Sequence, residues 1–345
     1  MHTTPFSGEP SINSVPVLSF GLQNPGHPWW RVGERLAEAL VGFAFPLLPE
    51  VRVSLTTPPA LQGALYNPIA VSTGSLMFGM TTPSVAARMA TEGNGPFDRP
   101  YPHLRAIAAY PHVDYLVFSV DAALGVSSIE EIVERRLPLR LVTGRRSAAG
   151  VADVLTFAVE EILREYGASY SAIERWGGTV VFGGPTHVGG VLMRDGHADA
   201  LFHEAQMSPV WAAIAAARKV HILPIRDDVR ERMLRKYGFE RAEIPAGHAS
   251  GAVEPTATVD FSGWLLLCRD DLPDEWAYTV ARACDETRRG VEEDQAGRGE
   301  IAIPIDSRYL FNQTVIPLHA GALAYASEKG YMESTDRGLT SPYSP

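Results

Sequence analysis

Short apolar segments of strand length alternate with segments of helical periodicity along most of this chain. Residues 15–21 and 139–143 are apolar runs next to turn residues, as expected of short buried strands. Residues 29–43 and 152–166 place their apolar side chains at helical spacing. This order of elements predicts an α/β fold in which mostly parallel sheets are flanked by helices.

The length of the chain predicts more than one core. At 345 residues, we expect two lobes of roughly 100–200 residues each. The net charge of −10 argues against a nucleic-acid-binding surface, which needs clustered lysine and arginine. A cationic pocket inside an acidic shell stays open, because net charge does not set the local field.

The cysteines, histidines and glycines indicate no metal, no cofactor and no nucleophilic centre. Cys268 and Cys284 form no Cys-x-x-Cys pair, and we expect two small buried side chains, although a single bridge stays open. No His-x-x-x-His or His-Glu-x-x-His spacing occurs, and the glycine pairs at 183–184 and 189–190 lack the dinucleotide-binding spacing. A Gly-x-Ser-x-Gly motif is also absent from the sequence.

No segment of the sequence predicts a membrane span. The most apolar early stretch, residues 36–48, is short and contains Glu38 and Pro46. Residues 1–14 are polar and lack the basic start and apolar run of a secretory signal. We expect flexible tails at residues 1–14 and 332–345.

Several elements carry specific expectations. A proline pair should open a helix over residues 60–66, and residues 69–71 have the apolar character of a strand. Thr82 precedes a proline and should cap a helix over residues 84–90. Residues 257–268 should form a long strand segment around Gly263.

The first candidate site is a turn within residues 19–33, where a strand ends and a helix begins. Such a turn presents unpaired backbone N–H groups and the positive end of the helix dipole to a ligand. Each tryptophan is equally well explained as a side chain that faces the core. The candidate ligand-binding residues in this turn are Asn24, His27, Trp29 and Trp30.

The loop after residues 139–143 is the clearest candidate for an anion site. It contains Arg145, Arg146 and Ser147 among small residues that allow close approach of a ligand. Either arginine can hold a carboxylate through two parallel hydrogen bonds, and the serine can donate another. The sequence does not tell which arginine points inward.

The remaining candidates lie at or near the ends of predicted strands. Beside Thr57, two prolines remove two possible backbone donors. His203 and Glu204 end a predicted strand, and their spacing from other histidines does not favour a metal. The full set is Thr57, Thr81, Thr82, Trp176, His203 and Glu204.

Four segments resemble, in the same order, segments of the TAXI family of TRAP-transporter solute-binding proteins. Residues 19–33 resemble that family's opening Thr-Gly-Ser-Pro-Gly-Gly-Thr-Tyr-Tyr-Pro-x-Gly, with two tryptophans in place of the tyrosines. Residues 76–84 fall where the family has Asp-x-Ala-x-x-Gln-Ser-Asp, and residues 143–150 resemble its Gly-x-x-Gly-Ser-Gly loop. Residues 316–331 resemble its closing His-Pro-Gly-Ala…Tyr-Tyr…Glu-x-Gly pattern.

The resemblance implies a two-lobed, type II periplasmic-binding-protein-like fold with a ligand cleft between the lobes. Each lobe is expected to contain a mostly parallel sheet flanked by helices. The chain should cross between the lobes near residues 114–120 and return near 222–229. The expected division is lobe I at residues 15–115 plus 226–331 and lobe II at residues 116–225.

The resemblance also implies a function. The protein would capture a small organic anion, a carboxylate or an amino-acid-like molecule, for the membrane subunits of a TRAP-type transporter. It would need no catalytic residue and no cofactor, and it would not bind nucleic acid or insert into a membrane. The alternative is a cytoplasmic enzyme on the same fold, decarboxylase-like or another lyase or hydrolase, or a sensor. A removed signal peptide would place the protein in the periplasm, and the visible sequence otherwise places it in the cytoplasm.

Overall fold

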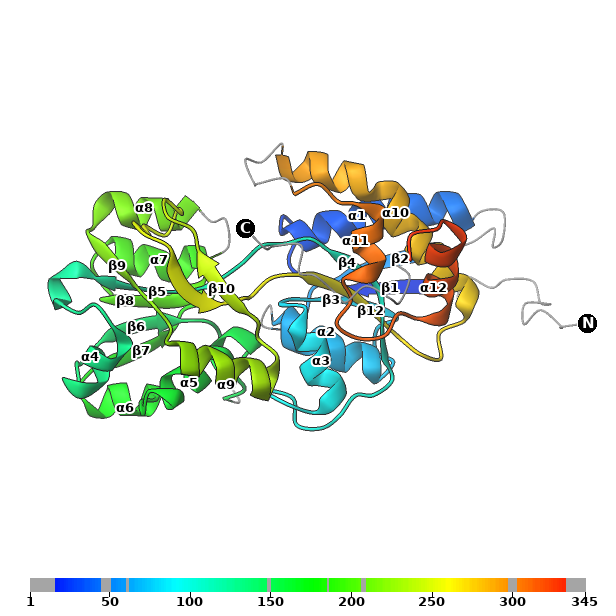
Figure 1. The fold of residues 1–345 in the computed structure, drawn as a ribbon. Helices are drawn as coiled ribbons and strands as arrows, with labels where there is room; N and C mark the ends of the chain where they lie inside the picture. Colours follow the sequence, from blue (N-terminus) through cyan, green and yellow to red (C-terminus); the bar gives the residue numbers. More distant parts are fainter. Residues whose placement is uncertain are drawn as a thin grey trace, which may run out of the picture.

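The computed structural model describes residues 16–44, 51–59, 62–147, 150–184, 186–205, 209–296 and 303–332. These residues form two lobes side by side, each built around a five-stranded sheet (Figure 1). The expected tails lie outside the described residues, except for Met332. No helix in the described part of the chain is long and apolar enough to cross a membrane.

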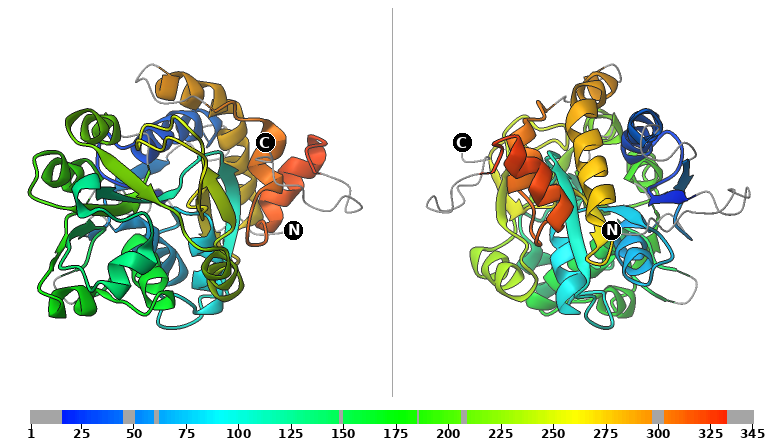
Figure 2. Two further views of the ribbon diagram at one scale, coloured as in Figure 1. Left: turned by 60° about the vertical axis from the view of Figure 1, so that its left-hand side comes forward. Right: turned by 90° about the vertical axis from the view of Figure 1, so that its right-hand side faces the viewer.

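The first lobe contains the sheet β2-β1-β3-β12-β4. Its strands are β1 (Val17–Gly21), β2 (Arg52–Thr56), β3 (Phe78–Thr81), β4 (Leu104–Tyr110) and β12 (Trp264–Arg269). Its helices are α1 (Pro28–Ala44), α2 (Gly63–Ser72), α3 (Val85–Glu92), α10 (Asp274–Ala296), α11 (Ser307–Asn312) and α12 (Ala320–Glu328). Figure 2 shows α10 and α12 packed together at the outer end of this lobe.

The second lobe contains the sheet β7-β6-β8-β5-β9. Its strands are β5 (Leu116–Asp121), β6 (Arg140–Thr143), β7 (Thr179–Phe182), β8 (Ala200–Glu204) and β9 (Val220–Leu223). Its helices are η2 (Ala122–Leu124), α4 (Ile129–Glu134), α5 (Val154–Glu165), α6 (Tyr170–Arg175), α7 (Thr186–Arg194) and α8 (Pro209–Ala217). The chain continues with α9 (Asp227–Tyr237) and the antiparallel pair β10 (Arg241–Ile244) and β11 (Thr256–Val259).

The expected two-lobed α/β fold is confirmed, and in each sheet four of the five strands run in the same direction. In the first sheet β12 runs antiparallel to both β3 and β4, and in the second β5 runs antiparallel to both β8 and β9. The other strand pairs of the two sheets are parallel. Strands β5 and β12 run against the other strands of their sheets because they are the two strands that the chain enters from the other lobe.

The two crossings between the lobes run beside each other. The backbone N–H of Phe261 donates to the Asp114 carbonyl at 3.0 Å, and that of Gly263 donates to the His112 carbonyl at 2.9 Å. Residues 257–268 therefore do not form one continuous strand. They divide into β11 and β12 at Gly263, whose φ of +84° suits glycine.

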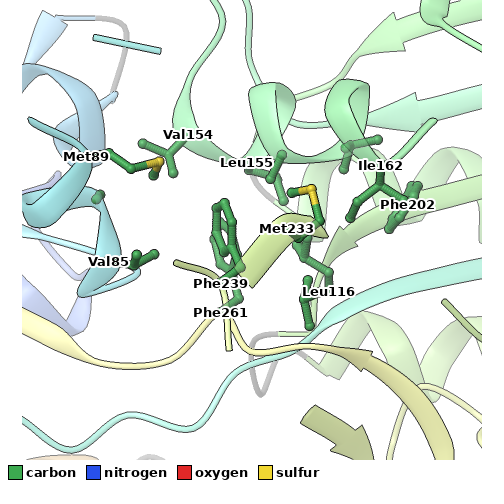
Figure 3. Packing of buried hydrophobic residues seen from close by; sticks show 14 of the residues in the cluster. Val85, Met89, Leu116, Val154, Leu155, Ile162, Phe202, Met233, Phe239 and Phe261 are labelled. Atoms are coloured by element: carbon green, nitrogen blue, oxygen red, sulfur yellow. The ribbon is translucent and has the colours of Figure 1, made fainter. Parts of the chain in front are cut away.

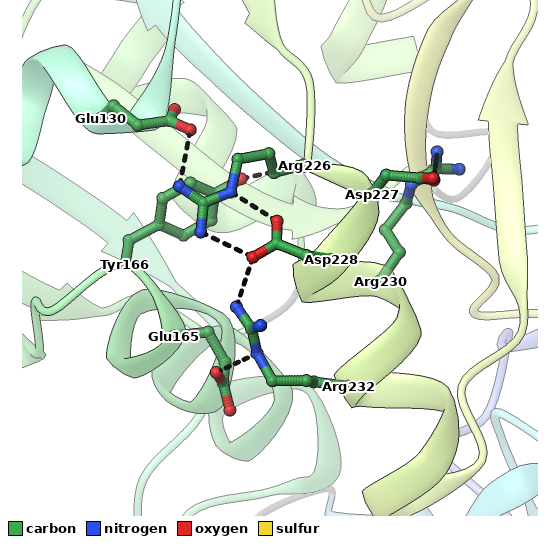
Figure 4. Close-up of polar contacts among 8 residues, drawn as sticks. All are labelled: Glu130, Glu165, Tyr166, Arg226, Asp227, Asp228, Arg230 and Arg232. Carbon is green, nitrogen blue, oxygen red and sulfur yellow. Dashed lines mark hydrogen bonds and ion pairs between the residues drawn. The ribbon is translucent and has the colours of Figure 1, made fainter.

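Helix α9 is bound to the second lobe by charged side chains (Figure 4). Arg226 bonds to Glu130 of α4, and Arg232 and Lys236 both bond to Glu165 of α5. These ion pairs favour a return crossing at residues 260–263, after β11, over one near residues 222–229. The division of the chain into lobes at residue 225 stays a prediction.

Apolar side chains also join the lobes directly. Figure 3 shows Met89 of α3 next to Val154 of α5, with Leu155 further along α5 and Phe239 and Phe261 below in the view. All five side chains are buried and belong to one cluster. The two lobes therefore bury apolar surface against each other, which stabilises this closed arrangement.

Two local expectations in the first lobe are wrong. Residues 69–71 lie inside α2, where Ala70 and Val71 form its buried face, so the apolar run belongs to a helix. Thr82 does not cap α3, because Ser84 occupies the position before the helix and the Thr82 hydroxyl donates to the Gly263 carbonyl at 3.1 Å. The helix predicted from residue 60 begins at Gly63, and residues 60–61 lie outside the described residues.

Candidate functional site

A cavity of about 300 Å³ lies between the two lobes. The first lobe contributes the turn between β1 and α1, the start of α2, and Thr82. The second lobe contributes the loop between β6 and α5, the start of α5, and the end of β8. The wall residues are Gln23, Asn24, Gly26, His27, Pro28, Trp29, Gln62, Gly63, Ala64, Thr82, Arg145, Asp153, Val154, Leu155, Gly184, His187, His203, Glu204 and Phe261.

His27 gives the cavity a neutral hydrogen-bond donor. Its Nδ1 accepts a hydrogen bond from the backbone N–H of Trp29 at 3.2 Å, which leaves the proton of the neutral ring on Nε2. Burial and, to a smaller extent, the nearby charge of Arg145 together lower the pKa of His27 to about 4. The imidazole is therefore uncharged near neutral pH.

The two adjacent tryptophans have different surroundings. Trp29 is fully buried, lies in the cavity wall, and its indole Nε1 has no partner among the described residues. Trp30 lies outside the wall and donates from Nε1 to Glu34 at 3.1 Å. Asn24, at the cavity rim, is exposed and bonds to the Pro25 carbonyl.

Asn67 of α2 holds the turn after β1 through hydrogen bonds to backbone carbonyls. Its Nδ2 donates to the carbonyls of Gly21, Leu22 and Met80 at 2.9, 3.2 and 2.8 Å. A Cβ at Gly21 would lie 2.7 Å from the Asn67 Oδ1, so only glycine permits this approach. Asn67 thus joins the ends of β1 and β3 next to the cavity, a role that its position in the sequence does not indicate.

The loop between β6 and α5 holds Arg145 at the cavity. Its backbone N–H donates to Oδ2 of Asp153 at 3.0 Å, and its carbonyl accepts from the Thr156 hydroxyl at 2.9 Å. Asp153 also caps α5, because its Oδ1 accepts from the Thr156 N–H at 2.7 Å. The Arg145 side chain is half-buried and passes Gly184, where a Cβ would meet Nε at 3.3 Å.

Arg146 and Ser147 lie outside the cavity wall. The Arg146 guanidinium lies over the rings of Phe182 and Tyr170, 4.2 and 5.6 Å from their centroids. The Ser147 hydroxyl accepts from the Val151 N–H at 3.1 Å within the loop. Of the two adjacent arginines, the structure therefore places Arg145 at the cavity.

His203 has both ring nitrogens engaged. Its Nε2 donates to the Gly184 carbonyl at 3.0 Å, so Nδ1 accepts from the Thr186 hydroxyl at 2.8 Å. Burial lowers the pKa of His203 to about 4. It is therefore a neutral ring that fixes the loop before α7.

Two carboxyl groups stand beside Arg145. Burial, and after it the charge of Asp153, raises the pKa of Glu204 to about 8 against the opposite effect of Arg145. Burial also raises the pKa of Asp153, against the hydrogen bonds from the Thr156 and Arg145 N–H groups. Near neutral pH the cavity thus contains a guanidinium and a carboxylic acid that can donate a hydrogen bond.

The structure gathers about half of the predicted residues in one place. Within the wall lie Asn24, His27, Trp29, Thr82, Arg145, His203 and Glu204. Outside it lie Trp30, Thr57, Thr81, Arg146, Ser147 and Trp176.

Three of the residues outside the wall bond to backbone carbonyls or pack on the core. The Thr81 hydroxyl is buried and donates to the Ala64 carbonyl at 2.9 Å, and the exposed Thr57 bonds to the Gln23 carbonyl. Trp176 ends α6 and packs on the core of its lobe.

Sequence reasoning missed Gln23, Gln62, Asp153 and His187 in the wall. The available signal for Asp153 was an aspartate at the second residue of the predicted helix over residues 152–166, where a capping residue is common. Gln62 reaches across the cavity mouth, since its Nε2 lies 3.5 Å from the Val151 carbonyl of the other lobe. Among the described residues, no group of three or more His, Cys, Asp or Glu side chains is arranged to hold a metal ion.

Comparisons with known proteins identify a family. The model of the NMT1-like family matches residues 25–330, and no curated protein matches the chain. Among solved structures, a TctC solute-binding protein from Polaromonas without ligand is 13% identical, with 93% of this chain and 98% of that chain covered and a TM-score of 0.49. XAC2383 from Xanthomonas citri, bound to a chloride ion, is 12% identical, with 90% and 99% covered and a TM-score of 0.45. At these values, nothing about the ligand of this chain follows from either likeness.

Proposed function

Because a model of the NMT1-like family covers residues 25–330, the chain belongs to that family, and we propose that it is a solute-binding protein for a small organic anion. The observation that carries the proposal is the position of Arg145 in the wall of a cavity between two lobes. A guanidinium presents several N–H donors in a planar fork that matches a carboxylate. In a half-buried wall this attraction is stronger than in bulk water.

Neighbouring donors support the same ligand class. Nε2 of His27 carries a proton, the protonated Glu204 can donate, and the amides of Gln23 and Gln62 lie in the wall. A carboxylate offers several acceptor lone pairs to such a set. The cavity of about 300 Å³ lies at the small end of ligand pockets, which favours a compact carboxylate or an amino-acid-like molecule.

The proposal includes delivery to the membrane subunits of a TRAP-type transporter and a periplasmic location. Both rest on the resemblance of four sequence segments to TAXI solute-binding proteins. Reconstituted membrane subunits, if encoded beside this gene, should import the bound anion only when this protein is added. Recovery of a chemically altered ligand after incubation would instead favour an enzyme on this fold.

The central test compares the two adjacent arginines. A panel of small carboxylates and amino acids is first screened by thermal shift, and the best binder is then titrated by calorimetry. Arg145→Gln should weaken binding at least about tenfold, because it removes a charge-assisted contact. Arg146→Gln is the matched control and should change the dissociation constant less than about twofold, since its guanidinium stacks on Phe182 outside the wall. Equal losses in both variants, or none in either, would contradict the proposal.

A further inference from the structure

The side chains of the cavity wall that can carry a full charge near neutral pH come from one lobe. They are Arg145, Asp153 and Glu204, which lie between β6 and α5 and at the end of β8 in the second lobe. Among the described wall residues, the first lobe contributes no lysine, arginine, aspartate or glutamate. We propose that the ligand carries a single carboxylate, held by the second lobe, and an uncharged body that faces the first lobe. This inference rests on the proposed function and narrows its ligand to a class that excludes dicarboxylates.

The wall has one permanently cationic side chain to pair with a carboxylate. Arg145 is the one lysine or arginine among the described wall residues. Next to the wall segments, four stretches lie outside the described residues, and their sequence contains no lysine or arginine: 60–61, 148–149, 185 and 206–208. A second carboxylate would therefore find no second guanidinium or ammonium group in this wall.

The histidines of the wall do not replace a second cation. His27 and His203 have pKa values of about 4, chiefly because both rings are buried, and they are neutral near pH 7. The side chain of His187 is exposed. An ion pair formed there would stay in water, where such pairs contribute little to affinity.

Asp153 disfavours a second negative charge in the cavity. Its carboxylate accepts hydrogen bonds from the backbone N–H groups of Arg145 at 3.0 Å and Thr156 at 2.7 Å, which favour the charged form. A monocarboxylate brings one like charge into the same wall, and a dicarboxylate brings two. Like charges repel more strongly in a half-buried wall than in bulk water. The wall therefore tolerates one ligand carboxylate better than two.

The turn before α1 does not compensate with backbone N–H groups. Pro28 has no N–H, and the Trp29 N–H donates to Nδ1 of His27 at 3.2 Å. The Trp30 N–H donates to the His27 carbonyl at 3.0 Å. The N–H groups of these two tryptophans, which the sequence predicts to be unpaired, are thus bonded within the turn. What the first lobe offers from this side is the neutral His27 ring and uncharged amides such as that of Gln23.

Apolar side chains line the cavity beside the charged groups. Val154 and Leu155 follow Asp153 directly in α5, and Phe261 lies on the crossing between the lobes. All three are buried, with exposed fractions of 1, 6 and 2%. A carbon skeleton placed against them leaves water and gains free energy. A carboxylate in the same place would lose its hydration without gaining a partner.

Matched pairs of acids test the ligand class in wild type. Pentanoate is compared with glutarate, and 2-aminopentanoate with glutamate, so that each pair differs by a second carboxylate at the end of a five-carbon chain. Calorimetric titration at about pH 7.5 keeps these carboxylates ionised. In each pair that binds, the acid with the uncharged end should bind at least about tenfold more tightly. Equal or tighter binding of glutarate or glutamate would overturn the inference.

A cation added to the first lobe should reverse part of this preference. The Gln23 amide lies over the start of α2, with Nε2 3.1 Å from the position of a Cβ at Gly63. Gln23→Lys should therefore improve binding of the dicarboxylate relative to its monocarboxylate partner by at least about tenfold. Glu174→Gln, on the exposed surface of α6, makes the same change in net charge and should leave the ratio unchanged. An unchanged ratio in folded Gln23→Lys would contradict the role of the uncharged first lobe.

Failure of this inference is distinct from failure of the proposed function. A dicarboxylate that binds wild type more tightly than its partner, and is lost in Arg145→Gln, would overturn the single-carboxylate class and leave the anion-binding function in place. Absence of binding by every carboxylate and amino acid tested would refute both.

Discussion

Asn67 is a single buried amide that fixes the geometry next to the cavity. Its three hydrogen bonds join carbonyls at the end of β1, in the following turn and in β3. The turn after β1 carries His27 and Trp29, so the wall inherits its position from Asn67. Asn67 is therefore a core side chain that positions the cavity wall although it is not part of that wall.

Substitution of Asn67 should damage both stability and binding. Asn67→Ala leaves three carbonyls without their shared donor, and we expect a loss of about 1–3 kcal/mol in the free energy of unfolding in urea. The exposed Asn24→Ala should change that free energy by less than about 0.5 kcal/mol. Equal stability of the two variants would show that the Asn67 amide does not support this turn.

Arg145 and Arg146 show where residue-scale prediction stops. The sequence correctly predicts a loop with an arginine between a strand and a helix. The choice between the two depends on Phe182 and Tyr170, which come from β7 and α6 and provide the aromatic surface for Arg146. This surface forms only when distant elements pack, so local sequence does not reveal it.

At the scale of elements, the C-terminal helix α12 is fastened to α10 through one buried carboxylate. The hydroxyls of Tyr325 and Tyr331 both donate to Oδ2 of Asp285, at 2.8 and 3.1 Å, and Arg288 bonds to its Oδ1 at 3.0 Å. Tyr325 and Tyr331 belong to the C-terminal segment whose pattern resembles the TAXI family. Their contacts in the first lobe give this segment a structural role.

Removal of that carboxylate should loosen the C-terminal helix. Asp285→Ala leaves the hydroxyls of Tyr325 and Tyr331 without their hydrogen-bond acceptor, and we expect a loss of about 2–4 kcal/mol in the free energy of unfolding. Glu286→Ala, on the exposed face of the same helix, removes a pair with Arg282 and should cost at most about 0.5 kcal/mol. Amide hydrogen exchange should increase along α12 in the first variant only; unchanged protection there would refute the clamp.

Element prediction failed where a short run fits two structures. Residues 69–71 are apolar over three positions, which a strand and the buried face of a helix explain equally well. These residues form a helix and not a strand because Asn67 and Val71, four positions apart, are both buried on one face of α2. Helix α6, with six residues capped by Ser169, is too short for its periodicity to be recognised.

At the scale of the whole molecule, the sequence predicted two lobes and a first crossing near residues 114–120, but not the pairing of the two crossings with each other. Residues 257–268 are rich in strand-forming residues, and only the backbone conformation at Gly263 separates β11 from β12. The pairing of the two crossings requires long-range contacts between residues 112–114 and 261–263. Such contacts leave no periodic signal in the sequence, which therefore does not reveal that β5 and β12 run against the other strands of their sheets.

The buried apolar contact between the lobes predicts how the closed form is stabilised. Met89 lies on α3 next to Val154 of α5, and both belong to one buried cluster with Leu155 (Figure 3). Met89→Ala removes apolar area that is buried when the lobes meet, so it should weaken closure as well as the fold. Leu36→Ala on α1 removes a comparable side chain from the core of the first lobe alone and is the matched control.

Both variants should lose about 2–5 kcal/mol of unfolding free energy, because each leaves a cavity in a packed core. Only Met89→Ala should increase the radius of gyration of the ligand-free protein in solution scattering, because only its cavity lies between the lobes. The same variant should bind the anion more weakly, since part of the binding free energy is then used to close the lobes. An unchanged radius in Met89→Ala, with the expected loss of stability, would mean that the apolar contact supports the fold without controlling the opening of the cleft.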